Sequence, residues 1–123
     1  MRLWIVLGAA NAFLSVAAGA FGAHALKARL PQDLLTIFET GARYHMYHSL
    51  GLIAIGLVAQ TRPSPLLSTA GGAMLAGIVL FSGSLYVLAL TGIRALGAIT
   101  PIGGLGFLVG WALLAIAVWR SAA

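Results

Sequence analysis

The chain lacks cysteine altogether among its 123 residues. Disulfide bonds, thiolate catalysis and cysteine-ligated metal centres are therefore excluded, and cysteine usage says nothing about the redox compartment. Charge is also scarce, because only 7% of the residues are charged where a soluble domain carries roughly 25%. With 61% hydrophobic residues and a mean hydropathy of +1.04, the chain cannot cover a soluble surface, and we expect lipid to be its solvent.

Acidic side chains are the rarest charged type, which leaves a formal net charge of +5. Asp33 and Glu39 stand against seven basic residues that are single and scattered: Arg2, Lys27, Arg29, Arg43, Arg62, Arg94 and Arg120. Because no basic patch forms, nucleic acid is not expected as a partner. Basic residues near the ends of apolar runs favour contact with membrane lipid head groups instead.

Long apolar runs are what the sequence has in quantity. Four of them cover residues 3–23, 40–59, 66–90 and 101–119, and none alternates with the period of two that barrel strands show. Each run is close to the ~20 residues that a transmembrane helix needs. We predict an all-α integral membrane protein, a bundle of four transmembrane helices that forms one domain over residues 1–123.

The connection between the first two runs is the longest. Leu34, Leu35 and Phe38 recur there at helical spacing, and Pro31 can occupy a first helical turn. This pattern predicts a short interfacial helix between the first two transmembrane helices.

The N-terminal run has a rival interpretation as a cleavable signal peptide, since Arg2 precedes it and small residues follow near Gly19. The run is long enough to span a membrane, so we expect it to be retained. Orientation stays open. With four spans, Arg2, Arg62 and Arg120 lie on one side, and Lys27, Arg29, Arg94 and, at the edge, Arg43 lie on the other.

Small residues recur at helical spacing on the first and last runs. They are Asn11, Ser15, Ala18, Gly19 and Gly22 on the first run, and Gly103, Gly106 and Gly110 on the last. Such stripes let helix backbones approach closely in lipid. We expect them to pack within the bundle, with a homo-oligomer interface as the alternative.

Polar side chains gather in one half of the predicted bundle, because antiparallel threading brings four helix ends to the same membrane side. The candidate ligand-binding residues there are His24, Tyr44, His48, Ser82, Ser84, Tyr86 and Thr100. At a rise of 1.5 Å per residue, His48 lies about 12 Å below Thr40, almost half-way through the hydrocarbon. Ionisable residues at such depth usually face a partner, a cavity or a bound species.

Spacing divides the polar residues of the second helix. Tyr44, His45 and His48 share one face, which we expect to look into the bundle. Glu39 and Arg43 are four residues apart, and this spacing predicts a structural ion pair at the helix mouth.

Three interpretations of His45 and His48 stay open. They can be neutral and hydrogen-bonded to Ser82, Ser84 or a backbone carbonyl, they can relay protons or contact a substrate, or they can ligate metal or haem. No carboxylate shares their face, so a closed metal site lacks ligands. Haem with two histidine ligands would require His24 to face His48. We therefore expect no metal and no cofactor.

No catalytic constellation is visible, and we do not expect an enzyme. Ser82 is the nearest candidate for a nucleophile, but it has neither a Gly-x-Ser-x-Gly elbow nor a paired acid. The glycine and two hydroxyls of Phe81–Tyr86 instead suggest a close helix crossing or a local kink.

Several of these segments together resemble a known family. They are Gly19–Lys27, Phe38–Leu50, Phe81–Tyr86 and Thr100–Gly104. The chain resembles the YgdD/YwdK-like family, domain of unknown function 423, related to transmembrane protein 256, over almost its whole length. The resemblance implies four transmembrane helices in a bacterial inner membrane, with no settled activity and no established catalytic residues. It also leads us to expect glutamine in place of His45 in many relatives, which gives His24 and His48 more weight.

The leading hypothesis is a non-enzymatic, multi-pass protein of the cell inner membrane with a binding site in its polar half. The site would take a membrane lipid, a small ligand or a membrane protein partner. The alternatives are a small transporter or proton-coupled component, a haem-binding redox protein, and a structural or assembly factor.

Overall fold

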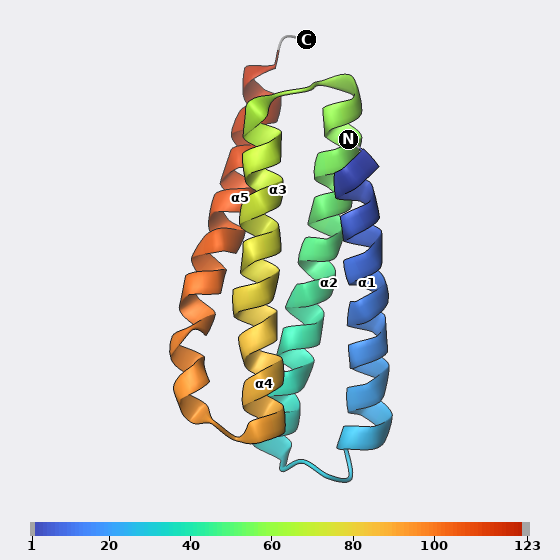
Figure 1. Cartoon of the computed structure of the whole chain (residues 1–123), viewed down its shortest axis with the longest axis vertical. Helices are drawn as coiled ribbons and strands as arrows, with labels where there is room; N and C mark the ends of the chain where they lie inside the picture. Colours follow the sequence, from blue (N-terminus) through green and yellow to red (C-terminus); the bar gives the residue numbers. More distant parts are fainter. Residues whose placement is uncertain (1, 122–123) are drawn as a thin grey trace.

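Four antiparallel helical rods make up the computed structural model of the chain, which describes residues 2–121 (Figure 1). The first rod is α1, Arg2–Phe21, continued by the π-helical turn η1, Gly22–Leu26; the second is α2, Gln32–Thr61. The third comprises α3, Pro65–Gly77, the π-helical turn η2, Ile78–Ser82, and α4, Gly83–Thr91. The last consists of the 3₁₀ turn η3, Arg94–Ala98, and α5, Thr100–Arg120.

All four predicted apolar runs are helical, and the described residues contain no strand, so the all-α prediction is confirmed. Three rods are long and apolar enough to cross a membrane: Arg2–Leu26, Pro65–Thr91 and Arg94–Arg120. The rod α2 is not among them, since Arg43, His45 and His48 interrupt its apolar stretch.

The prediction of a separate interfacial helix was wrong. Residues 34–38 form the first turns of α2, which runs without interruption from Gln32. No proline or glycine stands between Gln32 and Thr40 to end the helix. Leu35 and Phe38 are buried and pack with Leu26 and Ala89, so their apolar face covers the end of the bundle rather than a lipid surface.

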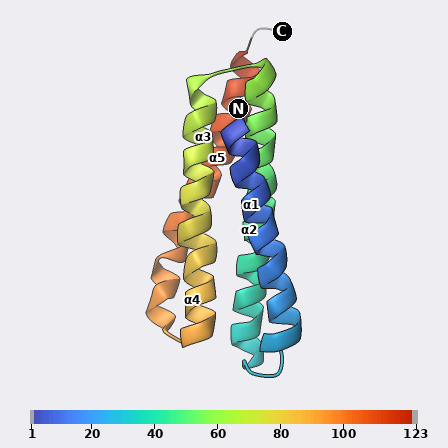
Figure 2. The same cartoon turned by 45° about the vertical axis from the view of Figure 1, so that its right-hand side comes forward.

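The order of the rods makes α2 central. In Figures 1 and 2, α1 lies beside α2 and α5 lies beside α3, while α2 and the α3–α4 rod form the middle of the bundle. The start of α1 and the end of α5 lie towards the same end of the molecule (Figure 1), as four antiparallel rods require. The turns themselves follow from local chemistry: Ser64 caps α3 through Leu66 N at 3.2 Å, and Gly92 ends α4 with a φ of +73°.

The α5 glycines pack within the bundle, as predicted. A Cβ atom on Gly103 would meet the backbone of Phe81, and one on Gly106 would lie 2.9 Å from the Ala73 carbonyl oxygen. The third member, Gly110, faces the Met74 side chain. On the first rod Gly22 packs on Phe38, whereas Gly19 has open space around it. The close crossing suggested for Phe81–Tyr86 is found at Phe81, where the π-helical turn η2 packs on Gly103, whereas Gly83 of that segment has open space around it.

This packing gives a stability test at two adjacent glycines. Gly103→Ala should destabilise the folded protein by about 1–3 kcal/mol, because the backbone of Phe81 has to retreat. Gly104→Ala should be close to neutral, since its Cβ would meet only the edge of Phe81, at 3.9 Å. Thermal or denaturant unfolding in detergent micelles measures both, and equal losses would contradict the assignment.

Candidate functional site

The structure separates the predicted site residues into three groups rather than one pocket. Tyr86 joins a hydrogen-bond network around His45, Ser84 bonds to Thr100, and Tyr44 and His48 line a groove against α5. The remaining two candidates, His24 and Ser82, make no hydrogen bond with the described residues.

His45 is the centre of a buried network that joins three rods. Its Nδ1 lies 2.9 Å from the Tyr86 hydroxyl on α4, and its Nε2 lies 2.9 Å from Asn11 Oδ1 on α1. Asn11 Nδ2 donates to the Leu7 carbonyl oxygen at 2.8 Å, which leaves Oδ1 as the atom facing the histidine. His45 Nε2 must then donate and Nδ1 must accept, so a single neutral tautomer satisfies every member of the network.

The family resemblance gives His24 and His48 more weight than His45, but this network shows that His45 has the more extensive hydrogen bonding. His45 has both ring nitrogens occupied and its carbonyl accepts a hydrogen bond from Ser49 at 2.6 Å. Nearby, Ser15 of α1 donates to the Ala42 carbonyl oxygen of α2 at 2.7 Å. Buried polar bonds between helices hold membrane bundles together, so His45 is a structural centre of the fold and not a dispensable neighbour of His48.

Ser82 and Ser84 of the third rod differ in the hydrogen bonding of their hydroxyls: that of Ser84 has partners and that of Ser82 has none among the described residues. Ser84 donates to the Phe81 carbonyl oxygen at 2.9 Å and lies 2.7 Å from the Thr100 hydroxyl, which ties α4 to the start of α5. Ser82 is fully buried, and its Oγ is the buried side-chain polar atom of residues 2–121 that has no hydrogen-bond partner. Neither serine bonds to a histidine.

His48 turns towards α5. Its ring stacks on Phe107 with a centroid distance of 3.4 Å and an angle of 7°, and it lies 5.7 Å from Trp111. The Nδ1 atom is 2.7 Å from the Tyr44 carbonyl oxygen. Only 4% of the residue is exposed. The carbonyl oxygen is thus the hydrogen-bond partner of Nδ1, whereas Nε2 has no partner within residues 2–121.

A groove of about 650 Å³ lies beside this stack, between α2, η2 and α5. We call it the His48 groove. Its lining residues are Tyr44, Tyr47, His48, Phe81, Pro101, Gly104, Leu105, Phe107, Leu108 and Trp111. The lining is therefore mostly aromatic and aliphatic, and it contains no lysine, arginine, aspartate or glutamate.

His24 does not take part in any of these groups. It lies exposed on η1, because Gly22 and Leu26 are the buried positions of that turn and His24 lies two residues from each. It makes no ring contact with His48, so the two-histidine haem arrangement considered from the sequence is not formed. Within residues 2–121 no three His, Asp or Glu side chains gather closely enough to hold a metal ion.

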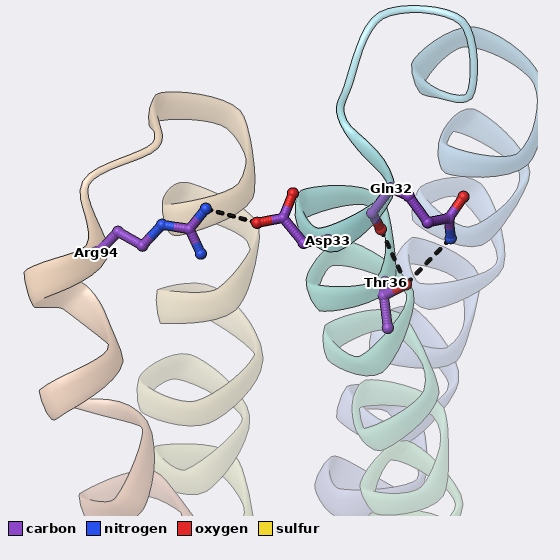
Figure 3. Close-up of polar contacts among 4 residues, drawn as sticks. All are labelled: Gln32, Asp33, Thr36 and Arg94. Carbon is purple, nitrogen blue, oxygen red and sulfur yellow. Dashed lines mark hydrogen bonds and ion pairs between the residues drawn. The ribbon is translucent and has the colours of Figure 1, made fainter.

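The ion pair at the polar end differs from the one that spacing predicted. Glu39 and Arg43 are both exposed and do not pair. Instead, Arg94 of η3 donates to Asp33 Oδ2 of α2 at 2.6 Å (Figure 3). The pair joins the α4–α5 connection to the first turn of α2, where Thr36 also bonds to Gln32. The hydrogen bond from Arg94 holds the pKa of Asp33 below its ordinary value.

Sequence reasoning missed three residues of these groups. Asn11 was placed in a packing stripe, although a lone amide in the middle of an apolar run requires a hydrogen-bond partner. Phe107 and Trp111 carried no polar signal, but they lie at i and i+4 on α5, next to glycines that bring that helix close.

The network predicts a measurable coupling between α2 and α4. Tyr86→Phe and His45→Phe should each destabilise the protein, and the double variant should show a coupling energy of about 0.6–1.7 kcal/mol. Tyr47→Phe serves as the control because that hydroxyl has no partner among the described residues. Unfolding in detergent provides the values, and strictly additive losses would rule out the bond.

The Asp33–Arg94 pair predicts a shift in titration. The folded-state pKa of Asp33 is lowered, so the pair stabilises the fold above the carboxyl's ordinary pKa and is lost as pH falls through the lowered one. Arg94→Gln should move the pKa of Asp33 upward towards its ordinary value, whereas Arg43→Gln should leave it in place. Carboxyl ¹³C NMR titration reports both, and an unchanged value in Arg94→Gln would disprove the link.

Comparison with known proteins finds relatives over most of the chain. The family described as a protein of unknown function (DUF423) matches residues 18–104. The chain is 49% identical to the UPF0382 membrane protein YwdK of Bacillus subtilis, over 95% of this chain and 96% of the relative. It is 51% identical to a UPF0382 membrane protein of Staphylococcus epidermidis, over 99% of both chains. No solved structure matches. The chain is thus a membrane protein of unknown function that belongs to the DUF423 family.

Proposed function

We propose that this protein binds a membrane lipid or a lipid-soluble small molecule in the His48 groove, and that it acts by binding rather than by catalysis. One observation carries the proposal: a groove of about 650 Å³ with an aromatic lining and one histidine that has an unpartnered ring nitrogen. Small-molecule sites typically measure about 300–1,000 Å³ and combine apolar walls with a few polar groups.

The rim of the groove supports entry from the side. Tyr47, Leu105 and Leu108 are 49%, 62% and 67% exposed on the outer surface of the bundle. In a membrane protein such apolar surface faces acyl chains. A ligand dissolved in the bilayer would therefore reach His48 laterally, without crossing the bundle.

We also propose that α2 crosses the membrane as a fourth span in a bacterial inner membrane. At 1.5 Å per residue its 30 residues reach about 45 Å, more than the ~30 Å hydrocarbon core. Three polar side chains near its middle, His45, His48 and Ser49, are buried against neighbouring rods. Burial against protein is how membrane bundles accommodate such residues. The exposed Glu39 and Arg43 lie nearer the start of the helix.

Filling the groove tests the proposal. Gly104 lines the groove, and a Cβ atom added there would meet only Phe81 within 4 Å. Gly104→Leu should weaken binding of the probe 4-decylphenol by at least about tenfold, or ~1.4 kcal/mol. Saturable shifts of the Phe107 and Leu108 amides in an NMR titration in phosphatidylcholine nanodiscs would measure the affinity.

The matched control is Gly72→Leu, a position on α3 with open space around it and away from the groove. This variant should bind the probe as the unaltered protein does. Shifts that never saturate, or equal affinities in both glycine variants, would leave the groove without a binding role.

A further inference from the structure

We infer that the His48 groove takes a neutral amphiphile whose head is a flat ring with a hydroxyl group, and that this hydroxyl donates to His48 Nε2. The inference rests on the proposed function and specifies the chemistry of its ligand. It follows from the tautomer of one histidine, the charge of the lining and the shape of the walls.

The tautomer of His48 is fixed by its neighbour. The Tyr44 carbonyl oxygen can only accept a hydrogen bond, so the contact of 2.7 Å requires a proton on Nδ1. In the neutral imidazole, Nε2 then carries a lone pair and is an acceptor. This is the opposite of His45, whose Nε2 donates to Asn11. A ligand atom that meets His48 must therefore be a donor.

The accepting nitrogen is not fully enclosed by the core. Among residues 2–121, Ser82 Oγ is the side-chain polar atom that is both fully buried and unpartnered. His48 Nε2 also lacks a partner but is not sealed in that way, and His48 lines the groove. The residue as a whole is more than nine-tenths buried. His48 thus supplies a fixed acceptor from among the residues that line an apolar groove.

The lining selects against charged heads. None of its residues is lysine, arginine, aspartate or glutamate. A carboxylate or phosphate would have no counter-charge there and would bring its oxygens towards a lone pair, at a high cost in desolvation. The Tyr44 and Tyr47 hydroxyls can donate or accept, so they do not discriminate. His48 is the group that sets the direction of the hydrogen bond.

The walls favour a ring as the head group. His48 and Phe107 are stacked, and the Tyr44 ring is within 20° of parallel to both, at centroid distances of 6.2 and 6.5 Å. Trp111 also lines the groove. Aromatic faces and edges of this kind attract a further ring in offset or edge-to-face geometry. The exposed Leu105 and Leu108 rim then suits an alkyl or isoprenoid tail.

Two matched probes test the inference in the full-length protein in phosphatidylcholine nanodiscs. 4-Decylphenol can donate a hydrogen bond, and its methyl ether, 4-decylanisole, cannot. The phenol should bind about three- to tenfold more tightly, which is the usual worth of one such bond. The ¹⁵N resonance of His48 Nε2 should move towards its hydrogen-bonded value with the phenol only.

Variants at two histidines complete the design. His48→Phe keeps a ring against Phe107 but removes the hydrogen-bond acceptor. The affinity for 4-decylphenol should then fall to about that for 4-decylanisole, a ratio of about one. His24→Phe makes the same change at an exposed histidine outside the groove and should retain the full ratio. If His48→Phe does not fold, the two probes and the Nε2 resonance of the unaltered protein decide the question.

The outcomes separate this inference from the proposed function. Equal, saturable binding of phenol and ether would overturn the hydroxyl donor while leaving the groove as a binding site. Tighter binding of oleate, a carboxylate, than of the phenol would also overturn it. Absence of saturable binding for every probe would remove the proposed function itself.

Discussion

The two hydrogen bonds of His45 are the constraint on which the rest of the bundle depends. Lipid offers no hydrophobic drive for one helix to pack on another, so association relies on close packing and on buried polar bonds. His45 bonds to α1 through Asn11 and to α4 through Tyr86, and these opposed contacts fix the rotation of α2 about its own axis. Three residues further along, a helix has turned by roughly 300°. The same rotation therefore directs His48 away from that network and against Phe107 of α5.

The two histidines differ because their surroundings impose opposite tautomers. His45 donates through Nε2 and accepts through Nδ1, which uses both nitrogens and leaves nothing for a ligand. His48 donates through Nδ1 to a carbonyl of its own helix and keeps the lone pair of Nε2. One imidazole thus holds the helices together while the other presents a directional acceptor to an apolar groove. A sequence contains the same letter at both positions, and only the neighbouring atoms distinguish them.

The helices were predictable from the sequence because their signals are local. Runs of apolar residues, Ser64 and Pro65 at the start of α3, and Gly92 at the end of α4 each mark structure within a few residues. The site was less predictable, because it depends on helix rotation. Spacing placed Tyr44, His45 and His48 on one face, yet a helical face is wide enough for His45 and His48 to meet different rods. Likewise Glu39 and Arg43 have the spacing of a pair, but the ion pair forms where the connection after α4 brings Arg94 to Asp33 in the first turn of α2.

Fold and groove are joined at two adjacent glycines of α5. Gly103 has no side chain to keep the helix from the backbone of Phe81, and this contact brings Phe107, one turn later, onto His48. Gly104 faces a different direction, where the missing side chain leaves space in the groove instead of allowing close packing. The π-helical turn η2 lies opposite both glycines and carries Phe81. The backbone of Phe81 packs on Gly103, and its ring lies beside Gly104 at the groove. The same helix crossing creates the packing contact at Gly103 and the groove at Gly104. A change that loosens the contact between α5 and η2 should therefore also displace the wall of the groove. Affinity and stability at this crossing are thereby coupled, whereas at Gly104 affinity can change alone.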